Sequence, residues 1–260
     1  MHLAPDRCAL IGMVHLRPLP GSPGWGGSMR AVLDAALADA RALADGGCDA
    51  LLVENMGDLP FLRGRVAPET VAAAALCVQA TAALGLPTGV QLLAAANREA
   101  LGVAVAAGAT FVRVEAFAYA HVADEGWLDA CAGELLRARR ALGADQVRVW
   151  ADVHKKHAAH AVTADLGLEE LARGAAFCGA DALVVTGART GAACAPGDVE
   201  AARAAGLPVL VGSGVTAASV AGLARRASGV IVGTSLKEQD DWRRPVELAR
   251  VRALRRALDA

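Results

Sequence analysis

The stretch "GGCDALLVEN", residues 46–55, has the pattern that decides the fold of this chain. Two glycines precede a run of apolar residues, and the run ends in Glu54 and Asn55. Glycine commonly ends a helix, and a strand that is apolar along its whole length is covered on both faces, as in a parallel sheet. The same order recurs in "CGADALVVTG" (178–187) and "AGLPVLVGSG" (205–214). These stretches therefore predict buried parallel strands that each follow a helix.

Eight apolar stretches of this kind occur along the chain, and alanine-rich stretches with helical spacing, such as 29–47 and 245–260, separate them. Eight alternations of strand and helix are typical of a (β/α)8 TIM barrel. We expect a single α/β domain of this type over residues 1–260. The predicted strands are "ALIGMVHL" (9–16), "ALLVEN" (50–55), "TGVQLL" (88–93), "TFVRVE" (110–115), "VRVWAD" (147–152), "ALVVTG" (182–187), "PVLVGSG" (208–214) and "GVIVGTS" (229–235).

The loop after the first strand argues against the alternative architecture, an open doubly wound sheet. That fold would carry a G-x-G-x-x-G turn at this place. The chain instead reads "GMVHLRPLPGSPGWGG" over residues 12–27, and its prolines favour a longer loop. No linker or low-complexity segment divides the sequence, so one domain is expected.

Composition narrows the classes of partner. The formal net charge is −1 and aromatic residues make up 3% of the chain, so neither a basic surface nor a stacking platform for nucleic acid is expected. The six cysteines are scattered without a C-x-x-C pair, which is typical of buried thiols in a reducing compartment. The N-terminus "MHLAPDRCAL" has no secretory signal pattern, and we expect a cytoplasmic protein. Whether it forms a homo-oligomer stays open.

One segment is long enough to suggest a membrane span, because no charged residue occurs from Thr70 to Asn97. Alanine dominates it, and "LGLPTG" interrupts it. We interpret it as a buried helix over about 69–84 and a strand over about 88–93, and we expect no transmembrane segment.

Polar residues gather at the carboxyl ends of the predicted strands, where TIM barrels carry their active sites. Each of these residues alone is as easily a loop hydrogen-bonder, but a full set on one rim predicts a site. The set is His15, Glu54, Asn55, Asp58, Gln91, Arg113, Glu115, Asp152, Lys155, Lys156, His157, Thr186, Arg189 and Thr190.

The stretch "ADVHKKHAAH", residues 151–160, contains two of the three lysines of the chain. A lysine amine can lose its proton, unlike an arginine, and the neutral amine is a nucleophile or a base. Repulsion from Lys155 lowers the pKa of Lys156, whereas Asp152 raises it, so two roles are open. Lys156 is either a Schiff-base nucleophile or general base with His157 as proton shuttle, or an ammonium that binds a substrate anion. We favour the second role.

His15 and Glu54 end the first two predicted strands and should be neighbours on the rim. A carboxylate beside an imidazole raises the histidine pKa towards neutrality, which suits proton transfer. The alternative is a structural hydrogen bond that holds the following loop.

Two glycine-containing turns end the last two predicted strands, in "VGSGVT" (211–216) and "VGTSLK" (232–237). Exposed N–H groups and hydroxyls in such turns bind phosphate, and TIM barrels often place a phosphate site there. The predicted phosphate-binding residues are Gly212, Ser213, Gly214, Gly233, Thr234 and Ser235. A side chain at Gly212 or Gly233 is expected to fill the place of the anion.

The chain resembles the BtpA family, which includes SgcQ-like proteins. The resemblance rests on "IGMVHLRPLPGSP", "VENMGDLPF", "ADVHKKHA", "VVTGARTG", "VLVGSGVT" and "GVIVGTSLK", and it spans residues 11–237. It implies a barrel of the ribulose-phosphate-binding type and a phosphorylated ligand, and the family name refers to photosystem I accumulation. The matching positions include His15, Glu54, Asn55, Asp58, Asp152, Lys156, His157, Thr186, Thr190, Ser213, Thr234, Ser235 and Lys237.

The sequence departs from the family pattern on two neighbouring strands. "GVQLLAA" (89–95) stands where the family typically reads "GVNVLRNDA", so Gln91 replaces an asparagine. The family's "RVN" is here "RVE", ending in Glu115, and Lys155 stands where the family usually has an apolar residue. The changed rim implies a different substrate or a loss of activity.

Three functions stay open on this basis. The first is an isomerase, lyase or aldolase-like enzyme that acts on a phosphorylated sugar or related metabolite. The second is a non-catalytic binding or assembly protein. The third, less favoured, is a metal-dependent hydrolase that uses His15, Asp152, His154 and His157, because the first strand lacks the H-x-H pair of such enzymes. We therefore expect no cofactor and no bound metal, without excluding a metal.

Overall fold

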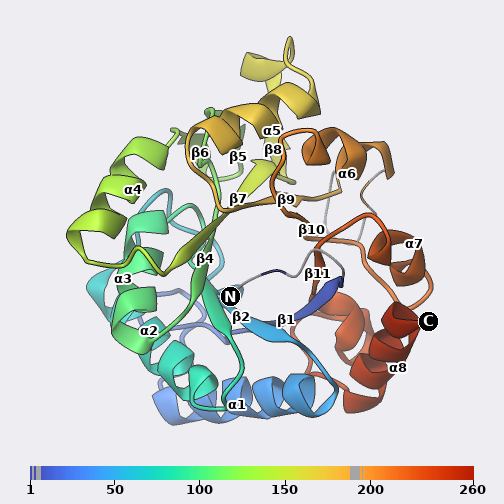
Figure 1. The fold of residues 1–260 in the computed structure, drawn as a ribbon. Coiled ribbons are helices and arrows are strands. Elements are labelled where there is room, and N and C mark those ends of the chain that lie inside the picture. The colour runs from blue at the N-terminus through green and yellow to red at the C-terminus, as the bar shows by residue number, and fades with distance from the viewer. Residues whose placement is uncertain (2, 4–6, 188–193, 195) are drawn as a thin grey trace.

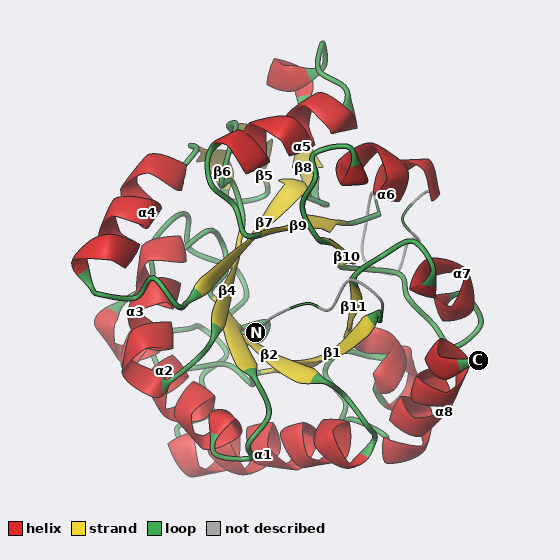
Figure 2. Cartoon of the chain, in the orientation of Figure 1, coloured by secondary structure: helices red, strands yellow, loops and turns green. Residues whose placement is uncertain are grey.

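The computed structural model describes residues 1, 3, 7–187, 194 and 196–260. Its parallel strands form a closed barrel in the order β1-β11-β10-β9-β7-β4-β3-β2. Figure 2 shows this ring of strands inside a ring of helices, so the predicted TIM barrel is confirmed. The barrel strands are β1 (Ala9–His15), β2 (Ala50–Glu54), β3 (Thr88–Gln91), β4 (Phe111–Val114), β7 (Arg148–His154), β9 (Ala182–Val185), β10 (Val209–Val211) and β11 (Gly229–Val232).

An α-helix follows each barrel strand and packs on the outside of the ring (Figure 1). The first begins after Ser28, whose hydroxyl accepts a hydrogen bond from the Ala31 amide, and ends at Gly46 and Gly47, as the opening sequence pattern predicts. The helices are α1 (Met29–Asp45), α2 (Pro68–Ala82), α3 (Asn97–Ala107), α4 (Ala132–Ala141), α5 (Leu168–Phe177), α6 (Pro196–Arg203), α7 (Val220–Ala224) and α8 (Leu248–Asp259).

The uncharged segment forms α2 and β3, close to the predicted helix over 69–84 and strand over 88–93. Within the described ranges, no helix has both the length and the apolar character that a membrane crossing requires.

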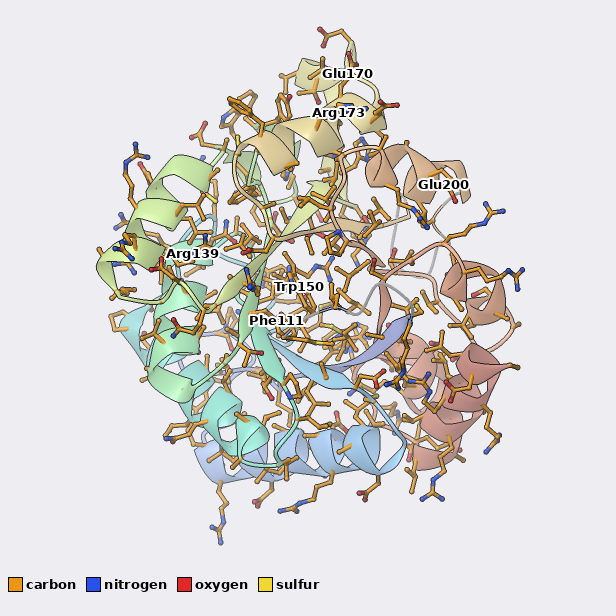
Figure 3. All side chains as sticks on the ribbon, in the orientation of Figure 1. Phe111, Arg139, Trp150, Glu170, Arg173 and Glu200 are labelled. Atoms are coloured by element: carbon orange, nitrogen blue, oxygen red, sulfur yellow. The ribbon has the colours of Figure 1, made fainter. Side chains whose placement is uncertain are left out.

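A stacked aromatic pair fills the barrel interior below the rim. The rings of Phe111 on β4 and Trp150 on β7 lie 3.7 Å apart between centroids, and Figure 3 shows both inside the ring. The neighbouring strand makes room for them, because a Cβ at Gly89 would lie 2.1 Å from the Phe111 ring. Since side chains alternate between the two faces of a strand, the residues two positions on, Arg113 and Asp152, face into the barrel directly above this pair.

A small antiparallel sheet is added to the barrel and was not predicted. It joins β5 (His121–Ala123), β6 (Gly126–Leu128) and β8 (Ala158–Ala159), in the order β6-β5-β8. Its last strand belongs to "ADVHKKHAAH", which we had interpreted as a loop after a strand ending at Asp152. In the structure β7 continues to His154, with an irregular register between Asp152 and His154, and the two lysines connect β7 to the small sheet.

Candidate active site at the carboxyl ends of the strands

The inward-facing residues at the carboxyl ends of β1, β2 and β3 form one row. His15 pairs in register with Glu54, and Glu54 pairs with Gln91. In the opposite direction round the ring from β1, the corresponding places carry Gly233 after β11, the other neighbour of β1, and Gly212 after β10. The predicted rim is therefore a continuous feature of the barrel, with bulky polar side chains on one side and glycines on the other.

A cavity of about 250 Å³ lies against these glycines, and half of the predicted site residues line it. It brings the two turns after β10 and β11 together with side chains from β1, β2, β4 and the segment after β7. Its lining includes His15, Glu54, Arg113, Lys156, Gly212, Ser213, Gly214, Val215, Thr216, Gly233, Thr234, Ser235 and Asp240.

Hydrogen bonds fix the two turns relative to each other and to the barrel. The Ser235 hydroxyl donates to the Val215 carbonyl oxygen at 2.7 Å, which ties the turn after β11 to the turn after β10. The Ser213 hydroxyl accepts from the Gly187 amide at 2.9 Å and keeps its own proton for another acceptor. Ser235 is thus committed to holding the turns, whereas Ser213 and Thr234 can still donate to a ligand.

The two glycines are closely packed, which gives a second reason for the absence of a side chain at these positions. A Cβ at Gly233 would lie 2.7 Å from His15 Cε1, and one at Gly212 would lie 2.7 Å from Val184 Cγ1. A side chain at either position would therefore collide with the barrel wall before it occupied the place of an anion.

Asp152 is held in a buried ion pair. Nε and Nη2 of Arg113 donate to its Oδ1 at 3.2 and 3.0 Å, and both side chains are almost fully buried. Since burying an unpaired charge is costly, this pair fixes both groups in the centre of the site. Asp152 therefore positions Arg113 rather than standing free at the mouth.

Lys156 lies between the two sides of the site. Burial lowers its pKa, and the Arg113 guanidinium adds to the effect, while Glu54, Asp152 and Glu115 act in the opposite direction. The neighbour that we expected to repel it, Lys155, is turned away and pairs with Glu115 and Glu125, at 3.4 Å in each case. A lowered pKa is the condition that the nucleophile or base role requires, whereas the anion-binding role needs no shift.

The histidine prediction is correct in position and wrong in electrostatics. His15 Nε2 lies 3.5 Å from Glu54 Oε2, as expected for neighbours on the rim. Burial nevertheless lowers the pKa of His15 to about 3, and the charges of Lys237 and Lys156 add to this effect. Burial also raises the pKa of Glu54, against the effects of Arg113 and Lys156. Burial therefore favours the neutral imidazole of His15 over the charged imidazolium that a raised pKa would give.

Three of the predicted rim residues fasten loops. Asn55 donates to Asp58 Oδ2 at 2.9 Å and accepts from the Leu93 amide at 2.7 Å. Asp58 accepts from the Leu19 amide at 2.7 Å, and Thr186 donates to the His154 carbonyl oxygen at 3.1 Å. These bonds hold the loops after β1, β2, β3 and β9 in place.

A second cavity, of about 220 Å³, opens on the side of β3 and β4. Burial raises the pKa of Glu115 in its wall to about 7, although Lys155 opposes the shift. His157 is exposed and also lines this cavity, so it lies at some remove from the glycine turns. Arg189 and Thr190 lie outside the described residues. The lining includes Glu54, Met56, Leu59, Phe61, Gln91, Leu93, Arg113, Glu115, Asp124, Glu125, Asp152, Lys155, Lys156, His157 and Thr186.

Sequence reasoning missed Glu125 near the site, and it named Lys237 only as a family position, without its burial. Glu125, the partner of Lys155, lies at the turn between β5 and β6, whose three-residue strands give almost no sequence signal. Lys237, whose charge lowers the His15 pKa, is buried against Asp39 of α1 at 2.5 Å. Its burial could have been suspected only from its rarity, since it is one of three lysines in the chain.

The described part of the chain contains no cluster of three or more His, Cys, Asp or Glu residues with the geometry of a metal site. Among the residues considered for a hydrolase, His154 stacks on His160 with 3.7 Å between ring centroids, and Asp152 is bound by Arg113. His15 lies on the opposite side of the mouth from His157, in the cavity that His157 does not line.

Comparison with solved structures finds the same fold at low sequence identity. Phosphoribosyl anthranilate isomerase from Thermus thermophilus superimposes with a TM-score of 0.57 at 18% identity, covering 96% of this chain and 98% of that one. KGPDC from Streptococcus mutans, solved in complex with D-R5P, gives a TM-score of 0.60 at 10% identity, over 97% and 98% of the two chains. Both comparisons support the barrel architecture.

Sequence comparison identifies the family. The photosystem I biogenesis protein BtpA of Synechocystis is 38% identical over 255 residues, which cover 96% of this chain and 87% of that protein. The profile of the BtpA family matches residues 6–260, including the loops that carry the first-strand prolines, the lysine pair and both glycine turns. The chain therefore belongs to the BtpA family.

Proposed function

We propose that this protein is an enzyme that binds a phosphorylated sugar or a related phosphate ester and transforms its carbon chain, as an isomerase or lyase does. The observation that carries the proposal is the composition of the first cavity. There the glycine turns after β10 and β11 face Lys156, Arg113, His15 and Glu54 within a single space of about 250 Å³. A phosphate on the turns would bring the adjoining carbons against a lysine with a lowered pKa.

The phosphate would be bound mainly by neutral donors. The proposal assigns it to backbone N–H groups of the turns and to the hydroxyls of Ser213 and Thr234. Arg113 supplies positive charge from below, because its Nη2 lies within 3.2 Å of the place where a Cβ of Gly212 would be. The Asp152 carboxylate accepts hydrogen bonds from Nε and from the same Nη2, and it keeps the guanidinium in this position.

Lys156 then has two ways to act on the substrate. Its neutral amine can take a proton from a carbon next to a carbonyl group, or it can attack the carbonyl carbon and form a Schiff base with loss of water. Glu54 lines the same cavity, and burial raises its pKa, which favours the protonated form that would return a proton to the substrate. Neutral His15 can donate or accept a hydrogen bond and orient the reacting group.

The phosphate site is tested by thermal stability. Inorganic phosphate or a sugar phosphate should raise the Tm of the wild-type protein, and Thr234→Glu should abolish the rise because a carboxylate would lie in the anion's place. Ala221→Glu is the matched control, since it adds the same charge at an exposed position on α7 and should keep the rise. A wild-type protein that no phosphate compound stabilises would remove the basis of the proposal.

The role of Lys156 is tested by borohydride reduction in the presence of carbonyl-containing phosphate esters, followed by mass mapping. A reduced adduct on Lys156 supports the Schiff-base route. If the wild-type protein turns the substrate over without forming an adduct, and Lys156→Met does not turn it over, the result supports the proton-transfer route. Full turnover in Lys156→Met contradicts both routes.

A second function is favoured by one observation, the 38% identity to a photosystem I biogenesis protein. On this alternative the barrel binds a phosphorylated ligand without turning it over and acts through assembly with other proteins. Ligand stabilisation without any turnover, unchanged in Lys156→Met, would favour this function. Its location, which we propose to be the cytoplasm, is supported by the six free cysteines, because such thiols are typical of reducing compartments.

A further inference from the structure

The second cavity adjoins the first, because the two share three lining residues. Glu54, Arg113 and Lys156 belong to the walls of both. A ligand whose phosphate lies on the glycine turns can therefore extend past Lys156 towards β3 and β4. The chemistry of the far cavity should indicate what the non-phosphate end of that ligand carries.

A buried, unpartnered amide oxygen lies in the wall of the far cavity. The side chain of Gln91 is on β3, only 2% of the residue is exposed, and its Oε1 has no hydrogen-bond partner among the described residues. A buried acceptor without a donor is destabilising and is rare in folded proteins. Gln91 lines the cavity, so a ligand that enters it can supply the missing donor.

Carboxylate oxygens dominate the remaining polar lining. Glu115 Oε2 accepts from the Ala95 amide at 2.9 Å, and it shares the Lys155 ammonium with Glu125 at 3.4 Å each. Asp124 and Glu54 add further oxygens to the wall. Two of the three lysine and arginine side chains in the wall are used within the protein, because Lys155 lies between two carboxylates and Arg113 is bound to Asp152. The third, Lys156, lies where the two cavities meet. Oxygen acceptors therefore outnumber the cationic donors that are not already paired within the wall of this cavity.

The net charge of the wall favours neutral donors over cationic ones. Burial raises the pKa of Glu115 to about 7, so this carboxyl is only partly ionised at neutral pH, and burial shifts the pKa of Glu54 in the same direction. Apolar groups of Met56, Leu59, Phe61 and Leu93 complete the lining and suit the C–H face of a carbon chain. Hydroxyl groups on a short carbon chain match this combination of acceptors, low charge and apolar surface.

We propose that the second cavity is a subsite for the hydroxyl-bearing carbon chain of a phosphorylated substrate, with Gln91 as its specificity-determining residue. The proposal rests on the proposed function, since it assumes that the phosphate occupies the glycine turns. It assigns the substrate to phosphorylated polyols and sugars, as opposed to phosphate esters with apolar or ammonium-bearing chains. Gln91 accepts a hydrogen bond from a substrate hydroxyl and positions the chain across Lys156.

The test compares the dissociation constants of four probes: inorganic phosphate, n-pentyl phosphate, 5-aminopentyl phosphate and D-ribitol 5-phosphate. Ribitol phosphate should bind about tenfold or more tightly than pentyl phosphate, because only its hydroxyls pair with the buried acceptors. In Gln91→Met, which keeps the side-chain shape, this preference should fall several-fold, and the affinity for pentyl phosphate should not change. Gln79→Met, at an exposed position on α2, is the matched control and should keep the preference.

The outcomes separate this proposal from the proposed function. If inorganic phosphate binds but ribitol phosphate gains nothing over pentyl phosphate, the subsite is refuted and the phosphate site stands. Tightest binding of aminopentyl phosphate refutes the assignment to hydroxyl groups. An unchanged preference in Gln91→Met refutes the role of Gln91. If none of the four probes binds, the proposed function fails and this proposal fails with it.

Discussion

The two sides of the barrel mouth differ in how they are built. The turn side, formed by the turns after β10 and β11, offers glycines, backbone N–H groups and hydroxyls. The carboxylate side, formed by β3, β4 and the small sheet, offers Gln91, Glu115 and Glu125. The first is rich in donors and the second in acceptors, which suits a ligand with an anion at one end and hydroxyls at the other.

Ion pairs lie on the carboxylate side and between the two sides. On the carboxylate side, Lys155 bridges Glu115 and Glu125 at the edge of a small sheet. Between the sides, Arg113 and Asp152 form a buried pair above the aromatic stack of Phe111 and Trp150. Arg113 lines both cavities, so this ion pair connects the turn side with the carboxylate side.

The largest effect is therefore expected at that ion pair. Arg113→Met should lower the free energy of unfolding by about 3–5 kcal/mol, because it leaves the Asp152 carboxylate buried without its partner. Urea denaturation measures the loss. The double variant Arg113→Met, Asp152→Leu should recover most of it, since no unpaired charge is then buried.

Arg173→Met provides the control for this prediction. Arg173 pairs with Glu169 on the outer face of α5, where their side chains are 58% and 50% exposed, and Figure 3 shows Arg173 away from the barrel interior. Its loss should cost about 0–1 kcal/mol. Equal effects of the two single substitutions would mean that the central pair does not hold the two sides together.

The next largest effect is expected on the carboxylate side, where Glu115 should make the free energy of unfolding depend on pH. Because the pKa of Glu115 is raised to about 7 in the folded chain, the native state binds its proton more tightly than the unfolded state does. Its contribution to stability is fully present below the unfolded pKa and is lost as the pH rises through about 7. Glu115→Gln should remove this loss, on the order of 2–3 kcal/mol between pH 4.5 and 8.

The measurement is the free energy of unfolding of both proteins across that pH range, taken as a difference so that other titrating groups cancel. Glu169→Gln on the surface of α5 should leave the wild-type profile unchanged. Parallel curves for the wild type and Glu115→Gln would show that burial does not perturb this carboxyl.

The sequence predicted the two sides to different degrees. The eight barrel strands and both glycine turns could be recognised because long apolar runs and glycine patterns are local signals. The small sheet was missed because strands of two or three residues, such as Ala158–Ala159, have no periodicity to detect. The contact between Lys155 and Glu125, which the small sheet brings about, was also missed because these residues are 30 positions apart in the sequence.

The chemistry of individual site residues was harder to predict than their positions. His15, Glu54 and Lys156 all line the predicted mouth. The direction of the His15 pKa was wrong because it depends on burial and on Lys237, which the fold brings close from the other end of the chain. The structural roles of Asn55 and Asp58 were likewise hidden, because their partners Leu93 and Leu19 come from other loops.

A smaller loss of stability is expected on the turn side, from a side chain added at Gly233. Gly233→Ala should destabilise the protein by about 1–2 kcal/mol, because the new Cβ would lie 2.7 Å from His15 Cε1 and the ring must move. Gly26→Ala is the control, since no atom lies within 4 Å of its added Cβ. Thermal or urea unfolding measures both. If the two variants were equally stable, the contact between the turn and His15 would be looser than the structure indicates.

The smallest expected effect is an absence of titration at His15. Burial and the charges of Lys237 and Lys156 lower its pKa to about 3, so the ring should stay neutral from pH 5 to pH 8. Imidazole NMR signals measured over this range, with His15→Asn used to assign the His15 resonance, should show about zero change for His15.

The same shift determines how His15 changes the free energy of unfolding with pH. Because the folded-state pKa is depressed, the stabilising contribution of neutral His15 is lost only as the pH falls below the unfolded value of about 6.5. His15→Asn should therefore flatten the acid limb of the stability curve and leave it unchanged above pH 7. An inflection of the His15 signal between pH 6 and 7 would instead restore the proton-transfer role that the sequence suggested, and it would make the turn side a source of protons as well as the expected site of the phosphate.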